Sequence, residues 1–346
     1  MAVIDVHCHL VPPRCLPMEA VAPDGRTYGL RLGRDAQGAP CPVVNGQPNR
    51  NCDPEQLWNL ERRLRDMDAA GVEVQVLSPP PFLLFYALPS HTAQEYARRF
   101  NAALAEITTA RPDRFRGMAT VPLQDPERAA AELEYAITEL GLHGVEIGTN
   151  VNGLNLDEPR FAPFFETVQR LAVPVFVHPH AVAGQERLQR YYLGNLIGNP
   201  LDTTICIASL IFGGVLDAFP GLKLIFAHGG GQAPYLVGRW DRGHAVRPEC
   251  QALPQPPSAY LQRLYFDTLC HRPQALHYLL LTVGASRLVL GTDYPFDMGD
   301  PQPQATLAAL PAAERAAVAG ETAARLYGIG DGAGRTPASK ARSTTR

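Results

Sequence analysis

Residues 3–9 read Val-Ile-Asp-Val-His-Cys-His, an apolar run that ends in two histidines one residue apart. This pattern predicts a buried β-strand. Alternate side chains of a strand share a face, so we expect His7 and His9 to point one way and Val6 and Cys8 the other. Two neighbouring imidazoles can form half of a metal site, although a lone His-x-His pair can equally be hydrogen-bonded at a strand end.

Seven further apolar runs have the length and composition of strands, and helical patterns lie between them. Such alternation is typical of βα units around a parallel sheet. The eight expected strands lie near residues 3–8, 72–78, 115–121, 143–148, 174–178, 223–228, 264–268 and 287–292. The expected helices include residues 92–110, 126–140, 160–172 and 273–283. Eight strands with intervening helices favour an α/β fold of the closed (β/α)₈ TIM-barrel type over an open sheet.

Two insertions interrupt this rhythm. Residues 11–56, rich in Pro, Gly and Asn, separate the first strand from a helix expected to begin at Pro54, and residues 181–220 add helical turns between strands five and six. Both follow the C-terminal ends of strands, where long loops favour a lid or a subunit contact. We interpret residues 1–330 as one domain with these insertions, followed by a polar tail over 331–346 that we expect to be disordered.

Composition narrows the class of protein. The chain has 346 residues, of which 46% are hydrophobic, so it can bury a large core. A formal net charge of −3 offers no basic face for nucleic acid or anionic lipid. We find no signal-peptide pattern and no apolar run approaching about 18 residues, so no membrane span is expected. Seven cysteines without a Cys-x-x-Cys pair indicate reduced thiols. We therefore expect a cytoplasmic protein.

Polar residues end three more of the predicted strands. His178 follows Pro-Val-Phe-Val, His228 follows Leu-Ile-Phe-Ala, and Asp293 follows Leu-Val-Leu-Gly-Thr. The C-terminal ends of barrel strands lie on one rim, so these side chains should converge with His7 and His9. Any one of them could have a structural role, but polar residues at the ends of four strands together indicate a metal site.

The residues of the fourth predicted strand indicate how many metal ions the site holds. Binuclear proteins of this architecture bridge two ions with a lysine at the end of that strand, but here residues 143–148 read His-Gly-Val-Glu-Ile-Gly. The two lysines of the chain are Lys223, at the opposite end of a strand, and Lys340 in the tail. Glu146 could bridge two ions, although a buried structural role is favoured. We expect one divalent ion, and three imidazoles with one carboxylate suit Zn²⁺ or Mn²⁺.

Two roles are open for His228. It could be a further imidazole ligand, or it could accept a proton from a water whose pKa the metal lowers to about 7. The second role is favoured because histidine titrates in that range. Glycines 229–231 would let backbone N–H groups approach an anion. Asp267, on strand seven, is expected to fix a neighbouring hydrogen bond and not to bind metal.

Several motifs occur in a fixed order along almost all of residues 1–328. They are IDVHCHL (4–10), LWNLERRLRDMDAAGVEVQV (57–76), VPLQD (121–125), VPVFVHP (173–179), NPLDTT (199–204), FAHGGGQAPYLVGRWD (226–241), PPSAYLQRLYFDT (256–268) and GTDYPF (291–296). This series resembles the aminocarboxymuconate semialdehyde decarboxylase branch of the amidohydrolase superfamily.

The resemblance implies a specific site and reaction. It implies a (β/α)₈ barrel whose one Zn²⁺ or Mn²⁺ is held by His7, His9, His178 and Asp293, with His228 as the catalytic base. The implied reaction is the non-oxidative loss of CO₂ from an unsaturated or aromatic carboxylic acid.

The resemblance also points to substrate-binding residues. The arginine with which the family grips its substrate corresponds to Asn51 here, and the adjacent Arg50 is a possible replacement. A second family arginine, which reaches across a dimer interface, matches Arg239, so a homodimer is expected. His180 and Tyr191 stand where tryptophans are usual in the pocket, which implies an altered small-molecule carboxylate substrate.

Other functions would use the same residues. A mononuclear hydrolase of a lactone or amide would employ the activated water as its nucleophile, and a hydratase of unsaturated acids is a variant of that hypothesis. A non-catalytic subunit that binds metal or carboxylate is disfavoured, because binding alone needs no proton acceptor beside an open coordination position.

Overall fold

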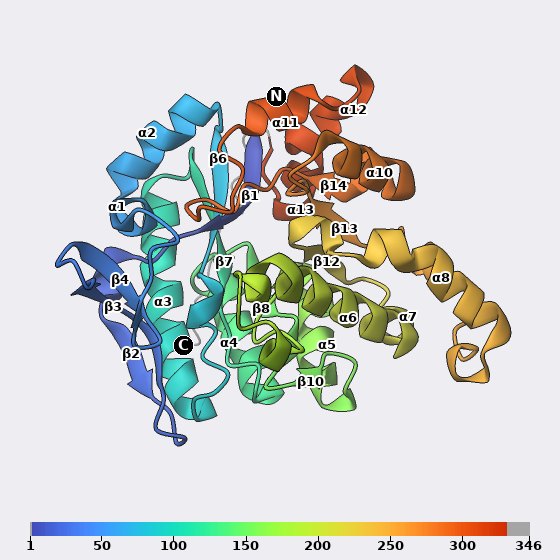
Figure 1. Ribbon diagram of the computed structural model, residues 1–346, viewed down its shortest axis with the longest axis horizontal. Helices are drawn as coiled ribbons and strands as arrows, with labels where there is room; N and C mark the ends of the chain where they lie inside the picture. Colours follow the sequence, from blue (N-terminus) through green and yellow to red (C-terminus); the bar gives the residue numbers. More distant parts are fainter. Residues whose placement is uncertain (1, 331–346) are drawn as a thin grey trace, which may run out of the picture.

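The computed structural model describes residues 2–330, so the tail predicted to be disordered, 331–346, lies outside the described residues. Eight parallel strands follow one another around the sheet in chain order, with helices outside them (Figure 1). They are β1 (Ile4–His9), β6 (Val74–Ser78), β7 (Phe115–Ala119), β8 (Gly144–Gly148), β11 (Pro174–His178), β12 (Lys223–Phe226), β13 (Tyr265–Asp267) and β14 (Leu288–Val289). The predicted barrel and all eight strand positions are confirmed.

The sheet closes between β1 and the segment that follows β14. The Val6 N–H donates to the Leu290 carbonyl at 2.9 Å, and the Asp293 N–H donates to the His7 carbonyl. Cys8 and Tyr294 form a parallel bridge. The last strand is therefore attached to the first at its C-terminal end, which is the end that carries the polar residues.

Helices cover the outside of the barrel where apolar residues recur three to four positions apart. The four expected helices appear as α3 (Ser90–Ala110), α4 (Pro126–Thr138), α5 (Ala162–Leu171) and α10 (Pro273–Val283). The remaining α-helices are α1 (Pro54–Trp58), α2 (Leu60–Ala70), α6 (Asn199–Phe212), α7 (Val215–Ala218), α8 (Ala233–Val246), α9 (Pro257–Leu261), α11 (Pro303–Ala308), α12 (Ala312–Ala316) and α13 (Thr322–Tyr327). Helix α1 begins at Pro54 as predicted, because the Asp53 side chain accepts a hydrogen bond from the Glu55 N–H.

The interior of the barrel holds its own apolar cluster, which includes Val6, Phe176 and Ile225 together with Leu326 of α13. The expectation that Val6 lies opposite the histidines of its strand is therefore wrong. The register of β1 against β6 shifts between Asp5 and Cys8, and such a shift breaks the strict alternation of faces.

The first insertion is a small sheet and not the expected long loop. Strands β2 (Met18–Val21), β3 (Thr27–Arg34), β4 (Pro40–Val44) and β5 (Gln47–Pro48) pair antiparallel in this order. Leu30 of β3 stands opposite both Met18 and Val44, so an apolar row of two buried residues and one partly buried residue holds the strands together. Figure 1 shows β2, β3 and β4 on one side of the barrel, and α8 projecting from the other.

The second insertion contains η5 (Gly194–Gly198), α6 and α7, as the helical turns predicted there require. Among residues 2–330, the continuous helical segment Gly194–Phe212 is long and apolar enough to cross a membrane by length and composition alone, with a mean hydropathy of 1.2. The sequence analysis expected no segment of this length and hydropathy, and that expectation is corrected here. Nearly half of it is buried in the molecule, and the core helix of a soluble protein passes the same test.

Candidate metal centre and active-site cavity

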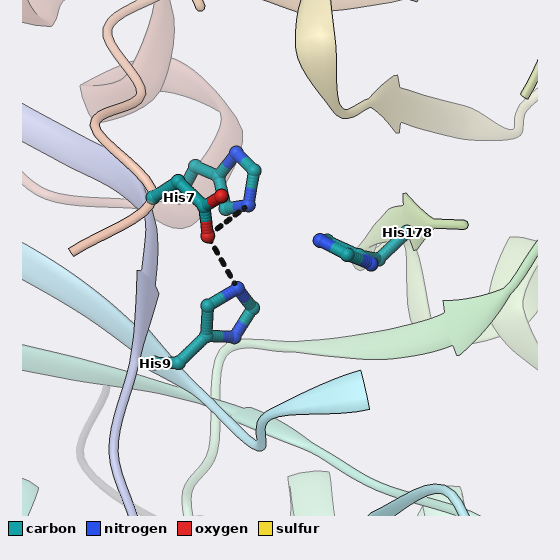
Figure 2. Close-up of side chains that lie close together, drawn as sticks. His7, His9 and His178 are labelled. Atoms are coloured by element: carbon teal, nitrogen blue, oxygen red, sulfur yellow. Dashed lines mark ion pairs between the residues drawn. The ribbon is translucent and has the colours of Figure 1, made fainter. Parts of the chain in front are cut away.

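Four side chains meet at the C-terminal rim of the barrel. His7 and His9 come from β1, His178 ends β11, and Asp293 follows β14. One ligand atom from each lies within 4.8 Å of those of the others, and all four residues are buried. Figure 2 shows the rings of the three histidines pointing toward a common space. The convergence expected from the four strand ends is thus present in the structure.

Several atoms in this space lack an ordinary partner. Asp293 Oδ1 lies 3.2 Å from His9 Nε2 and 3.3 Å from His7 Nε2. Within the described residues, these three buried atoms make no hydrogen bond. Buried polar atoms without partners are rare in folded proteins, and here they face one another around one point. Their chemistry, imidazole nitrogen and carboxylate oxygen, fits a divalent cation.

The outer nitrogen of each histidine is fixed by an oxygen acceptor. Nδ1 of His7 lies 2.7 Å from Asp267 Oδ2, while Nδ1 of His9 and of His178 each lie 2.9 Å from the carbonyl oxygens of Pro79 and Pro179. A proton on Nδ1 satisfies each of these contacts and leaves the Nε2 lone pair facing the common space. Contacts of this kind orient the histidine ligands of metal sites.

The protonation states suit a metal site. Burial lowers the pKa of His9, and burial together with the nearby His228 lowers the pKa of His178 well below its usual range. Both rings are therefore neutral. Burial alone would raise the pKa of Asp293, but the electrostatic interaction with His7 and the close approach of the surrounding histidines outweigh it and hold that pKa well below its usual range. Two neutral imidazoles thus stand beside an ionised carboxylate.

Asp267 organises both the cluster and the residue beside it. Its carboxylate contacts His7 and also accepts hydrogen bonds from the backbone N–H groups of His228, at 2.9 Å, and Gly229, at 2.7 Å. It therefore links strand one to the turn after strand six. This matches the expectation that Asp267 fixes a neighbouring hydrogen bond.

His228 lies at the edge of the cluster, at the start of η6 (His228–Gly230). Its Nε2 is 3.7 Å from Asp293 Oδ2, and its ring centroid lies 5.1 Å from that of His178. Within the described residues, its Nδ1 has no hydrogen-bond partner. Its φ is +55°, a left-handed conformation that turns the chain sharply after β12. The turn sets the ring beside the four-residue cluster.

Glu146 of β8 lies below the cluster and is fully buried. Its Oε2 is 3.9 Å from His9 Nδ1, a nitrogen that already contacts the Pro79 carbonyl. Burial raises the pKa of this carboxyl to about 8. The cluster of possible ligands does not include Glu146, in line with the structural role favoured for it.

Two cavities meet at the cluster. The larger, about 860 Å³, extends beneath the small antiparallel sheet of the first insertion. The second, about 550 Å³, runs between α6, α8 and α10 and has a mainly apolar lining that includes Leu269 and Tyr278. Both reach His228 and Asp293. A bound molecule could therefore contact the cluster from either side.

The expected substrate residues lie in different places. Asn51 lines the large cavity, and its Nδ2 donates to the Tyr192 hydroxyl at 3.1 Å. Arg50 is turned away, because its guanidinium pairs with Asp35 at 2.7 Å. Tyr191 is 73% exposed and lines neither cavity. Arg239 is exposed on α8 and lines neither cavity of its own chain.

Sequence reasoning missed two residues near the site. Tyr192, and not its neighbour Tyr191, contributes a phenol to the large cavity. The sequence offers no means of choosing between two adjacent tyrosines in an insertion. Arg63 of α2 is fully buried, donates to Gln75 Oε1 at 2.9 Å and also contacts the carbonyl of His9. The sequence of this helix contains several arginines and gives one indication that Arg63 is buried. Arg63 lies four residues before the buried Met67 and therefore on the same face of the helix.

Comparisons with known proteins give consistent results. A family model described as Amidohydrolase matches residues 4–329. The chain is 35% identical over 301 residues to the 2-amino-3-carboxymuconate-6-semialdehyde decarboxylase of Dictyostelium discoideum, a match that covers 86% of this chain and 82% of that protein.

Two solved structures are similar along nearly their whole length. The 5-carboxyvanillate decarboxylase of Sphingomonas paucimobilis has a TM-score of 0.82 at 26% identity, covering 95% of this chain and 99% of that one. The dihydroxybenzoic acid decarboxylase of Polaromonas sp. JS666, solved with bound manganese and the inhibitor 2-nitroresorcinol, has a TM-score of 0.77 at 27% identity and covers 95% and 97%.

Proposed function

The chain belongs to the amidohydrolase family, and on that basis we propose that it is a metal-dependent, non-oxidative decarboxylase of an unsaturated or aromatic carboxylic acid. Such an enzyme is a carbon–carbon lyase. The observation that carries the proposal is the buried cluster of three histidines and one aspartate where two cavities meet. The three similar proteins named above are all decarboxylases of carboxylic acids, which supports the same reaction and confirms the resemblance to the decarboxylase branch.

A single divalent ion fits the cluster, held by His7, His9, His178 and Asp293. The orphaned Nε2 and Oδ1 atoms and the fixed Nδ1 atoms support this ligand set. The manganese of the Polaromonas enzyme supports a divalent ion, and we propose Zn²⁺, with Mn²⁺ as the alternative. When bound, the ion would supply Lewis-acid chemistry by polarising substrate oxygen atoms.

His228 is the proposed proton carrier. Loss of CO₂ breaks the bond between the carboxylate carbon and its neighbour, leaves the electron pair on that neighbour, and requires a proton there. His228 borders both cavities, and its Nδ1 has no partner within residues 2–330. The Asp293 carboxylate, 3.7 Å from His228 Nε2, would stabilise the protonated ring between uptake and delivery.

We also propose a homodimer in which Arg239 of the partner subunit contacts the substrate. Large apolar side chains are exposed around the second cavity, including Leu196 of η5, Tyr235 of α8 and Tyr278 of α10. Exposed apolar patches of this kind favour association. Arg239 lies on the same helix as Tyr235 and makes no ion pair within residues 2–330, so its guanidinium could grip a carboxylate of a neighbour. A cytoplasmic location belongs to the same proposal.

The decisive experiment supplies the metal-loaded protein with a panel of hydroxybenzoates and unsaturated acids and measures evolved CO₂. Decarboxylation in D₂O should place deuterium on the carbon that loses the carboxylate, and a chelator should stop the reaction. A hydrolase or hydratase would instead consume water, with ring opening or hydration and no CO₂. If the protein turns over lactones, amides or alkenes in this way and releases no CO₂ from any acid, the proposal is wrong.

A further inference from the structure

The larger cavity has an unusual wall for a site that binds acids. Eight of its lining side chains are carboxamides, six from asparagine and two from glutamine. Four of them, Asn45, Gln47, Asn49 and Asn51, come from the first insertion. Carboxamides both donate and accept hydrogen bonds but carry no charge. The surface facing a bound molecule on this side is therefore polar and neutral.

Positive charge is scarce along the same wall. Among the described residues, Arg26 is the one arginine or lysine that lines this cavity, and its side chain is 78% exposed and lies 3.8 Å from the Asp24 carboxylate. His180 also lines the cavity, where its ring lies against that of Tyr86 with the ring centroids 5.6 Å apart. A carboxylate taken from water into this wall would find no arginine or lysine that lacks a carboxylate beside it.

Negative charge lies beside Asn51. Asp297 lines the same cavity, and its backbone N–H donates to the Asn51 carbonyl at 2.7 Å. A second carboxylate near Asn51 would approach this aspartate and be repelled. The local field at Asn51 thus disfavours anions.

Asn51 and Tyr192 form a neutral recognition pair. Asn51 Nδ2 donates to the Tyr192 hydroxyl oxygen, so the hydroxyl proton can be donated to a ligand. The side-chain oxygen of Asn51 makes no hydrogen bond within the described residues and can accept one. Burial, with the negative charges of Asp297 and Asp293, raises the pKa of Tyr192, so the phenol keeps its proton. One donor and one acceptor side by side suit a hydroxyl group.

We infer that Asn51 and Tyr192 select a substrate with one carboxylate, the reacting one, and with neutral hydroxyl or carbonyl groups on the side facing the first insertion, and that they reject a second carboxylate there. This rests on the proposed decarboxylase function. Helix α8, which carries the arginine proposed to bind across a dimer interface, lies on the side of the barrel opposite the small sheet (Figure 1).

The test compares matched acids. Each dihydroxybenzoate with a hydroxyl next to the carboxylate is paired with the benzenedicarboxylate in which a second carboxylate replaces the other hydroxyl, for example 2,3-dihydroxybenzoate with 2-hydroxyisophthalate. We compare kcat/KM for CO₂ release and, by calorimetry on metal-loaded His228→Ala, the affinity of the unreacted acids. The best dihydroxy acid should exceed its dicarboxylate partner by roughly tenfold or more in both measurements.

Variants at Asn51 identify the cause. In Asn51→Arg, kcat/KM and affinity for the dicarboxylate should rise at least about tenfold relative to the values for the dihydroxy acid. The reason is that the arginine adds a cation that can pair with the second carboxylate. Asn155→Arg is the matched control, since it adds the same charge on the exposed strand β10 (Leu154–Asn155), away from the cavity, and should leave the ratio unchanged. Should Asn51→Arg fail to fold, Asn51→Leu takes its place and should weaken binding of the hydroxylated acids only.

Two results would overturn the inference: a wild-type preference for the dicarboxylates, or folded Asn51 variants whose ratio equals that of the wild type. These outcomes are distinct from failure of the proposed function. If no acid releases CO₂, the decarboxylase proposal fails, whereas the calorimetric affinities still decide whether the wall rejects a second carboxylate.

Discussion

His7, His9 and Asp293 point unpartnered buried atoms at one position, and His178 brings a further ligand atom to it, so an ion bound there would join two distant parts of the fold. We predict one divalent ion per chain and its loss in His178→Ala. Chelation should lower the melting temperature of the wild type, since a ligand of the native state alone stabilises it. Metal analysis by mass spectrometry, with the exposed His277→Ala as control, measures both. Two ions per chain, or a full ion in His178→Ala, would contradict the ligand set.

His228 stands beside the cluster, and its substitution separates a proton carrier from a ligand. His228→Ala should keep its metal and lose about 10²–10⁴-fold in kcat. The physical reason is that the ring supplies a proton path while the four other side chains hold the ion. Metal content and turnover are measured on the same preparation. Parallel loss of both would show that His228 is a fifth ligand.

At the scale of elements, helix α2 is tied to the ligand-bearing strand β1 by one buried cation. Arg63 donates to Gln75 of β6 and to the His9 carbonyl, and its guanidinium lies 4.6 Å from the centre of the Tyr294 ring. Burial lowers the pKa of Arg63, but the guanidinium stays charged because its ordinary pKa is so high. The Arg63 guanidinium thus contacts both strand β1, which carries two of the proposed ligands, and the loop that follows Asp293.

Arg63→Met should therefore destabilise the protein by about 2–5 kcal/mol, because it leaves buried carbonyl oxygens without a donor. Chemical denaturation of the metal-free protein measures this. The neighbouring Arg65→Met, on the exposed face of the same helix, should change the free energy of unfolding by about 0.5 kcal/mol or less. Equal effects of the two substitutions would show that the buried contacts add no stability.

At the scale of the whole molecule, the proposed shared site can be tested by exchange of subunits. His228→Ala and Arg239→Ala should each be inactive or nearly so, the second with its metal retained. A mixture of the two should recover part of the activity, because some hybrid dimers contain one complete site. Light scattering and a tagged-subunit exchange assay establish that hybrids form. An inactive mixture after verified exchange would rule out the contribution of Arg239 across an interface.

The insertions show why a fold can be predicted more readily than its details. Strand positions around the barrel follow from local apolar runs, so the sequence alone located all eight. The small sheet β2–β5 was missed because β2 and β5 are short and because β4 contains Pro40 and Pro42, which hide the alternation of apolar residues. The apolar segment Gly194–Phe212 was missed because Asn199, Pro200 and Asp202 interrupt it.

The sequence by itself determined the barrel and the four residues expected to hold the ion. Both depend on periodicity: apolar runs mark the strands, and a polar residue at each strand end lies on a rim that every parallel barrel shares. The division into a single domain with two insertions, and the disordered tail, remain predictions from sequence. All of these inferences rest on local sequence patterns, and none depends on how the two insertions contact each other.

Only the tertiary structure decided what surrounds the rim. Asn51 and Tyr192 are 141 positions apart in the chain and belong to different insertions, so no local pattern joins them. The same holds for Arg50, which pairs with Asp35 and leaves the cavity without its guanidinium, and for the choice of Tyr192 over Tyr191. Periodicity predicts the face of a strand, whereas the direction of a loop side chain is set by the hydrogen bonds and charges of whichever segments fold against it.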